Sequence, residues 1–121
     1  MSNHSSEETR LIIDVTTEPA VGAAVLTPHG EIDLTTSDAL RAAMDRVIDK
    51  GATAIVLDLS DVSFVDSTAL GVLVLFHRRL GQRLMIAAAQ PAVLRLFEIT
   101  KFDSVLRLTD SVTTALTKLR P

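Results

Sequence analysis

The chain has 121 residues, a length typical of one domain with a single hydrophobic core. Its formal charge of -3 has the wrong sign for binding a nucleic-acid backbone, and only 3% of its residues are aromatic, which disfavours stacking on single-stranded bases. The chain contains no cysteine, which excludes disulfides, thiolate metal sites and cysteine nucleophiles. His4, His29 and His77 lack the spacing of metal ligands, so we expect no metal site and no cofactor.

The N-terminal segment, residues 1–10, is polar and has no apolar stretch of the kind found in signal peptides. We expect it to be a flexible tail, followed by one domain over residues 11–119. No apolar run approaches the roughly 20 residues that are needed to span a bilayer. These features predict a cytoplasmic protein that makes no membrane contact.

The domain begins with the pattern of two paired strands. Leu11, Ile13 and Val15 alternate with Ile12, Asp14 and Thr16, which indicates a strand that ends by Pro19. A second strand is expected over residues 21–26. The short connection suits a hairpin, so we expect these strands to be antiparallel. Residues 28–30 break the pattern, and residues 31–34 are expected to form an irregular passage into a helix.

The remaining sequence predicts alternating helices and strands. Apolar residues recur on one helical face over residues 37–50, with a possible capping box at Thr35 and Asp38 and a stop at Gly51. Further strands are expected over residues 53–59, 84–88 and 104–108. Further helices are expected over residues 67–80 and 91–100. A terminal helix is expected to be capped by Asp110 or Ser111 and to reach Leu119. The order β-β-α-β-α-β-α-β-α predicts an α/β domain with a mostly parallel sheet and one antiparallel edge strand.

The stretch from Asp58 to Val74 leads from a buried strand, through a short polar bend, into an apolar helix. Asp66 and Ser67 fall at the start of this helix, where either side chain can cap free backbone N–H groups. A phosphate at this point would find N–H donors and the positive end of the helix dipole. Ser67 is therefore either a helix cap alone or a phosphoryl acceptor.

Several polar residues are expected near Ser67. In open α/β sheets, functional groups gather in the loops that follow the carboxyl ends of the strands. Such loops contain Asp33, Ser63, Asp66, Ser67 and Thr68. We expect these five residues to share one end of the domain.

Ser67 lacks the surroundings of a catalytic nucleophile. Its hydroxyl would need a base within hydrogen-bond reach, and His77 lies about three helical turns away, roughly 15 Å at 1.5 Å per residue. The sequence has neither a Gly-x-Ser-x-Gly elbow nor a phosphate-binding P-loop. A hard-cation site is an alternative for Asp33, Asp58, Asp61 and Asp66, although turn formation and helix capping also account for them. We therefore expect no enzymatic activity.

Two segments resemble a known family. The first is Val65-Asp66-Ser67-Thr68-Ala69-Leu70-Gly71-Val72, which resembles the signature of the STAS domain, the fold of bacterial anti-sigma factor antagonists. The second is Gly30-Glu31-Ile32-Asp33-Leu34-Thr35, which resembles the Gly-Glu-Leu-Asp that follows an early strand in that family. Together the motifs and their spacing cover roughly residues 11–119. Thr68 and Ala69 stand where many members have serine and glycine, and Thr68 adds a second candidate acceptor.

The resemblance implies a phosphorylation switch at Ser67. The unphosphorylated domain would bind an anti-sigma factor that is also a serine kinase, and would thereby free a sigma factor. Phosphorylation would end this binding, and a metal-dependent serine phosphatase would reset the cycle. The resemblance places Asp33 and Asp66 near the kinase contact, with Ser63 and Thr68 as further partner-binding candidates. A non-phosphorylated scaffold or interaction subunit of a signalling or transport assembly is the alternative.

Two other groups have both structural and binding interpretations. Arg78, Arg79 and Arg83 form either a solvated face at a helix end or a binding patch. The helix over residues 91–100 is apolar nearly all round, so it either packs into the core or offers a dimer or partner surface. We expect a monomer or a weak homodimer.

Overall fold

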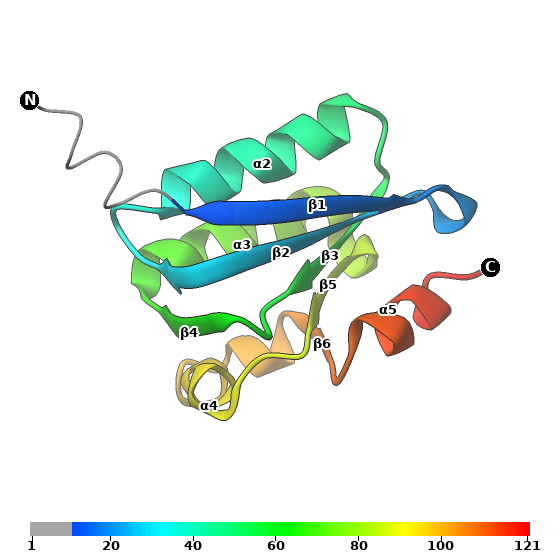
Figure 1. Cartoon of the computed structure of the whole chain (residues 1–121). Coiled ribbons are helices and arrows are strands. Elements are labelled where there is room, and N and C mark those ends of the chain that lie inside the picture. Colours follow the sequence, from blue (N-terminus) through cyan, green and yellow to red (C-terminus); the bar gives the residue numbers. More distant parts are fainter. Residues whose placement is uncertain (1–10) are drawn as a thin grey trace, which may run out of the picture.

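The computed structural model describes residues 11–121, so the predicted N-terminal tail lies outside the described residues. Six strands form the sheet: β1 (Ile12–Glu18), β2 (Ala23–Ile32), β3 (Ala54–Asp58), β4 (Val62–Val65), β5 (Leu84–Ala87) and β6 (Arg107–Thr109). The helices are α2 (Ser37–Asp49), α3 (Ser67–Leu80), α4 (Pro91–Ile99) and α5 (Val112–Lys118), with 3-10 turns η1 (Pro19–Val21), η2 (Gly81–Arg83) and η3 (Phe102–Ser104). Figure 1 shows their arrangement.

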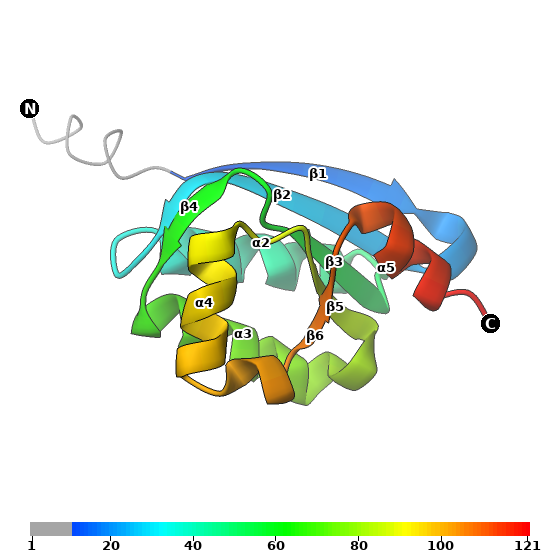
Figure 2. The ribbon, with the colours of Figure 1, turned by 90° about the horizontal axis from the view of Figure 1, so that it is seen from below.

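The sheet has the order β1-β2-β3-β5-β6, and β4 pairs with the far end of β2. Only β1 is antiparallel to its neighbour, since every other pairing is parallel. Helices α2 and α3 cover one face of the sheet and α5 packs on the other, while α4 lies beside β4 (Figures 1 and 2). The predicted fold class, an α/β domain with an antiparallel edge strand, is confirmed.

Strand β2 is longer than predicted. It continues past Pro28 to Ile32, with a bulge between Gly30 and Glu31. Proline is tolerated because the pairing with β3 has ended at Leu26, so the missing N–H interrupts no ladder on that side. The expected irregular passage over residues 31–34 was therefore wrong for its first half.

Strand β4 was not predicted at all. It has four residues, and its two central side chains, Ser63 and Phe64, are exposed while Val62 and Val65 are buried. A segment this short lacks the repeated alternation by which strands are recognised. Its pairing with β2 turns the expected polar bend into part of the sheet.

The helix ends were predicted well, but their caps less so. The predicted capping box at Thr35 and Asp38 was wrong, because α2 begins after Thr36 without a side-chain cap. Ser111 rather than Asp110 caps α5, accepting a hydrogen bond of 3.0 Å from the Thr114 backbone N–H. The strand expected from Ser104 begins only at Arg107, because Ser104 ends η3 and the next two residues form a turn and a bend.

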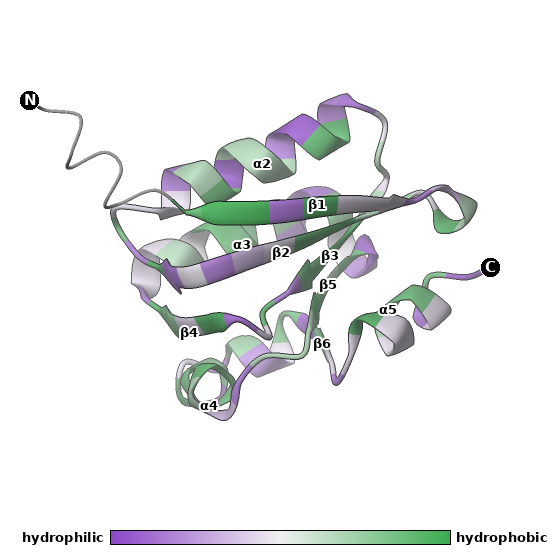
Figure 3. Ribbon diagram, in the orientation of Figure 1, coloured by the Kyte–Doolittle hydropathy of each residue, from purple (hydrophilic) through white to green (hydrophobic). Residues whose placement is uncertain are grey.

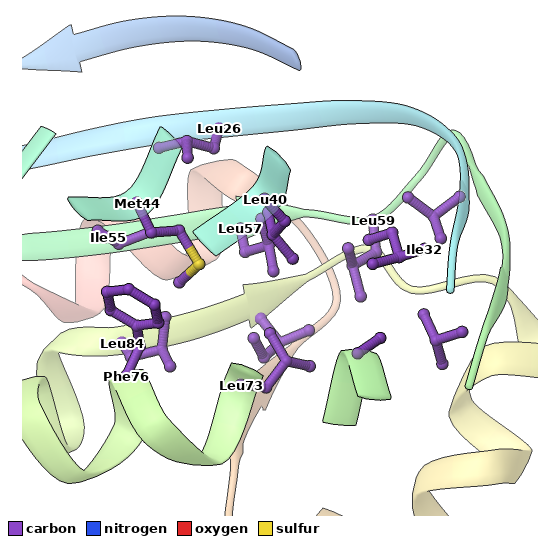
Figure 4. Packing of buried hydrophobic residues seen from close by; sticks show 14 of the residues in the cluster. Leu26, Ile32, Leu40, Met44, Ile55, Leu57, Leu59, Leu73, Phe76 and Leu84 are labelled. Carbon is purple, nitrogen blue, oxygen red and sulfur yellow. The ribbon is translucent and has the colours of Figure 1, made fainter. Parts of the chain in front are cut away.

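The main core lies between the sheet and helices α2 and α3 (Figure 4). Fully buried side chains on its sheet side include Leu26, Ile55, Leu57 and Leu84. Met44 of α2 and Phe76 of α3 pack against them, and neither is exposed. These contacts fix the two helices on the sheet and therefore place the N-termini that carry the candidate site.

Two surface groups with open interpretations are now located. Arg79 binds Asp45 at 2.6 Å and Arg83 donates to the carbonyls of Val21 and Thr53, so these arginines tie elements of the fold together. Much of α4 is hydrophobic in Figure 3. Its Val93 and Phe97 are buried in the core, whereas Leu94 and Ile99 are exposed, 36% and 66% respectively.

His29 of β2 lies between two carboxylates. Its Nδ1 is 2.6 Å from Oδ2 of Asp61 and its Nε2 is 2.8 Å from Oδ2 of Asp14. Both ring nitrogens can donate only when the imidazole is protonated. The hydrogen bonds with Asp61 and then Asp14 raise the pKa of His29 above its ordinary value of 6.5, outweighing the opposing effect of desolvation. When it is protonated, the ring therefore connects β1, β2 and the segment before β4.

We expect His29→Gln to lower stability more at low pH than at high pH. Because the pKa is raised on folding, the contribution of His29 is complete below its unfolded value and is lost as the pH rises through the folded value. Urea denaturation of the wild type and the variant at about pH 5.5 and about pH 8.5 measures the difference in their free energies of unfolding. The difference should be small, because water and salt screen the exposed charges. A stability difference that is equal at both pH values would contradict the prediction.

Candidate functional site

The first turn of α3 is capped by Asp66. Its Oδ1 accepts hydrogen bonds from the backbone N–H groups of Thr68, at 2.9 Å, and Ala69, at 3.0 Å. Asp66 has an extended backbone, as helix-capping residues do, and Ser67 is the first residue of the helix. The interpretation of Ser67 as the helix cap was therefore wrong, and the capping interpretation of Asp66 is confirmed.

Ser67 is exposed at this position. Within residues 11–121, its hydroxyl makes no hydrogen bond to a side chain or to the backbone. The positive end of the α3 dipole lies beside it. An exposed hydroxyl with no structural bond is available to an outside reagent.

Asp66 also binds the loop between β2 and α2. Its Oδ2 accepts a hydrogen bond of 3.0 Å from the Leu34 N–H, and its own N–H donates to the Ile32 carbonyl at 3.2 Å. One carboxylate thus joins the start of α3 to the loop that leads into α2, through two residues that lie 32 positions apart along the chain. The loop and the Ser67 turn are held together as one surface.

Asp33 shapes that loop. Its Oδ1 accepts from the backbone N–H of Thr35 at 2.9 Å and from the Thr35 hydroxyl at 2.7 Å. The hydroxyl of Thr36 donates to the Glu31 carbonyl at 2.8 Å and accepts from the Asp33 N–H at 2.9 Å. This pattern is typical of aspartate-initiated turns, so the turn-forming interpretation of Asp33 is confirmed.

Both carboxylates have lowered pKa values. For Asp66, desolvation raises the pKa, but hydrogen bonds from Ala69, Thr68 and Leu34 together outweigh it. For Asp33, hydrogen bonds from the Thr35 hydroxyl and backbone lower the pKa. The site therefore carries two carboxylates that are ionised at neutral pH.

The remaining predicted residues are arranged differently. Thr68 follows Ser67 in the first turn and is half-buried. Ser63 is exposed on β4 rather than in a loop, and within residues 11–121 no hydrogen bond joins it to Asp33 or Asp66. The structure therefore brings Asp33, Asp66, Ser67 and Thr68 together and leaves Ser63 on the adjoining strand.

Sequence reasoning missed two apolar side chains beside this cluster. Leu34, whose N–H binds Asp66, is 73% exposed, and Phe64 of β4 is 48% exposed. Phe64 pairs in register with Glu31 of β2. The exposure of Phe64 could be recognised only once β4 was known. For Leu34 the sequence held a signal, since it is an apolar residue inside the turn that Asp33 forms. Exposed apolar groups next to charged ones are typical of binding surfaces.

The other two aspartates considered for a cation site, Asp58 and Asp61, have structural partners. Asp58 accepts from the Ser60 N–H at 2.9 Å, and Asp61 binds His29. Among residues 11–121, no three acidic or histidine side chains are grouped so that they would hold a metal ion. In the same described range, no helix is both long and apolar enough to traverse a bilayer.

We expect Asp66→Ala to lower the free energy of unfolding by about 1–2 kcal/mol, because it removes the cap of α3 and the link to Leu34. Asp66→Asn should lose less, since an amide oxygen can still cap. Asp38→Ala is the matched control, as Asp38 is an exposed acid in the first turn of α2. Urea denaturation measures all three, and equal losses for Asp66→Ala and Asp38→Ala would rule the capping role out.

The family model of the STAS domain matches residues 7–115. The anti-sigma-F factor antagonist RsfB of Mycobacterium tuberculosis is 36% identical over 110 residues, covering 89% of this chain and 90% of that protein. The anti-sigma F factor antagonist of Paenibacillus polymyxa is 30% identical over 102 residues, covering 81% and 87%. A solved anti-sigma factor antagonist from Mycobacterium paratuberculosis superposes with a TM-score of 0.82 at 30% identity, over 93% of this chain and 97% of that one. Because the family model and these relatives match over most of the chain, it belongs to the STAS-domain family of anti-sigma factor antagonists.

Proposed function

We propose that this protein is an anti-sigma factor antagonist that is switched off by phosphorylation of Ser67. In the unphosphorylated form, it binds an anti-sigma factor with serine kinase activity and so frees a sigma factor. A metal-dependent serine phosphatase restores this form. The relatives are named as antagonists of anti-sigma factors, which supports an anti-sigma factor as the partner.

One observation carries the proposal: the Ser67 hydroxyl is exposed, while Asp66 alone caps the helix. A phosphoryl group can therefore be added without removing a hydrogen bond that the fold uses. The partial positive charge at the start of α3 also offsets part of the added negative charge. Phosphorylation is thus expected to leave the domain folded.

The phosphate would change the charge of the surface that binds the partner. It adds a charge of about -1.5 to -2 at neutral pH beside the ionised Asp66 and Asp33. In a complex, this charge would have to be desolvated, and it would repel acidic groups of the partner. Local electrostatics is then sufficient to end binding, with no change of fold.

Ser67 is the better of the two candidate acceptors. Thr68 is half-buried, and its backbone N–H is bound to Asp66, which fixes it within the capped turn. The partner surface in this proposal comprises Ser67 and Thr68 together with the neighbouring Asp33, Asp66 and Ser63. The exposed Leu34 and Phe64 add apolar area to the same surface.

Those two apolar residues also favour a second function, a binding module that needs no phosphorylation. The two functions differ in what a phosphate does. In the test, the purified protein is mixed with a preformed complex of its anti-sigma factor and sigma factor, and free sigma factor is measured by size-exclusion chromatography. Release by the unphosphorylated protein alone supports the switch. Release by both forms supports the constitutive module, and release by neither contradicts antagonism.

A further inference from the structure

A cavity of about 530 Å³ lies at the C-terminal end of α2, away from the loop that Asp66 holds. It opens between this end of α2 and the hairpin of β1 and β2, where α2 and β1 diverge in Figure 1. Its volume falls within the roughly 300–1,000 Å³ usual for small-molecule sites. The proposed function does not use this part of the domain.

Small residues leave this space open. Ala24 of β2 and Ala43 of α2 line it, together with Gly51 and Ala52 after the helix. A larger side chain at any of these four positions would occupy part of the volume. The remaining surface is mainly apolar, with Val15 of β1 exposed toward solvent. The cavity therefore offers a site for an apolar body.

Two cations line the same cavity. Arg46 lies in the last turn of α2 and Lys50 caps its C-terminal end four residues later, and no acidic side chain shares the lining. Within residues 11–121, neither cation forms an ion pair. Cations at a helix end also complement the dipole, so their charge alone would not indicate a ligand. Their position on the wall of an apolar cavity is the observation that indicates an anionic ligand.

The lining disfavours one common class of ligand, the nucleotides. It contains no aromatic side chain on which a nucleobase could stack. A ligand that matches this lining combines an apolar part with a negative charge. We propose that the cavity binds a free aliphatic monocarboxylate, with its chain against Ala24 and Ala43 and its carboxylate between Arg46 and Lys50.

Sodium octanoate is the probe, titrated into the full-length ¹⁵N-labelled protein and followed by NMR. We expect saturable shifts confined to amides around the cavity, including those of Val15, Ala24 and Ala52. Because a buried methylene contributes about 0.8 kcal/mol, each methylene removed from the chain should weaken binding about fourfold. Acetate should not bind measurably. Octanol should bind more weakly than octanoate, because it lacks the charge.

Charge is tested by a double variant, Arg46→Gln with Lys50→Gln. It should weaken octanoate binding about tenfold, or about 1.4 kcal/mol. The matched control is Arg41→Gln with Arg95→Gln, which removes the same charge from two exposed positions outside the cavity and should bind as the wild type does. Absence of saturable shifts with octanoate would overturn the proposal. So would equal weakening in both double variants, or octanol binding as tightly as octanoate.

Discussion

Ser67→Asp is expected to bind the anti-sigma factor kinase about a hundredfold more weakly than Ser67→Ala, a difference of about 2.8 kcal/mol. The alanine variant adds no charge and cannot be phosphorylated, whereas aspartate places a third carboxylate beside Asp33 and Asp66. Isothermal titration calorimetry with the same kinase preparation measures the two affinities. Both variants should remain folded, because the Ser67 side chain makes no bond that α3 requires.

The matched control for this pair is Thr113, an exposed residue in the first turn of α5. Helix α5 packs on the opposite face of the sheet, so Thr113→Ala and Thr113→Asp should bind the kinase equally. Equal affinities for the two Ser67 variants would show that charge at this position does not control binding. The constitutive module would then be the better account of the site.

Phe76→Ala is expected to lower the free energy of unfolding by about 3–5 kcal/mol. Phe76 is fully buried between α3 and the sheet, near Met44 and Leu84, so truncation leaves a cavity in the main core (Figure 4). The loss is a large fraction of the roughly 5–15 kcal/mol that stabilises a small domain. Urea denaturation measures it.

Leu75→Ala is the comparison for this core substitution. Leu75 precedes Phe76 on α3 but is 39% exposed, so its truncation should cost less than about 1 kcal/mol. Similar losses for the two variants would contradict the packing described for α3.

Local patterns in the sequence were sufficient to predict α3. Asp66 is a strong helix cap, Gly81 is a helix terminator, and the apolar residues between them allow only a buried helix. The predicted bounds of this helix are those observed. The family signature lies on the same segment, which is why the exposed Ser67 could be selected before the fold was known.

Interactions between distant segments could not be predicted in the same way. The bond from Leu34 to Asp66 depends on β4 pairing with the end of β2, and neither partner signals the other along the chain. Likewise, the cavity beside α2 is lined by Ala24 and Ala43, which come from different elements of the fold. Such features follow from packing and register rather than from periodicity.

Whether the switch operates can be decided from the phosphorylation state of Ser67 in the cell. The protein is purified from its own host with phosphatase inhibitors, its intact mass is determined, and its peptides are mapped. We expect one phosphate on Ser67 that disappears after phosphatase treatment. A protein that carries no phosphate during growth or under several stresses, or carries it only on Thr68, would contradict this expectation.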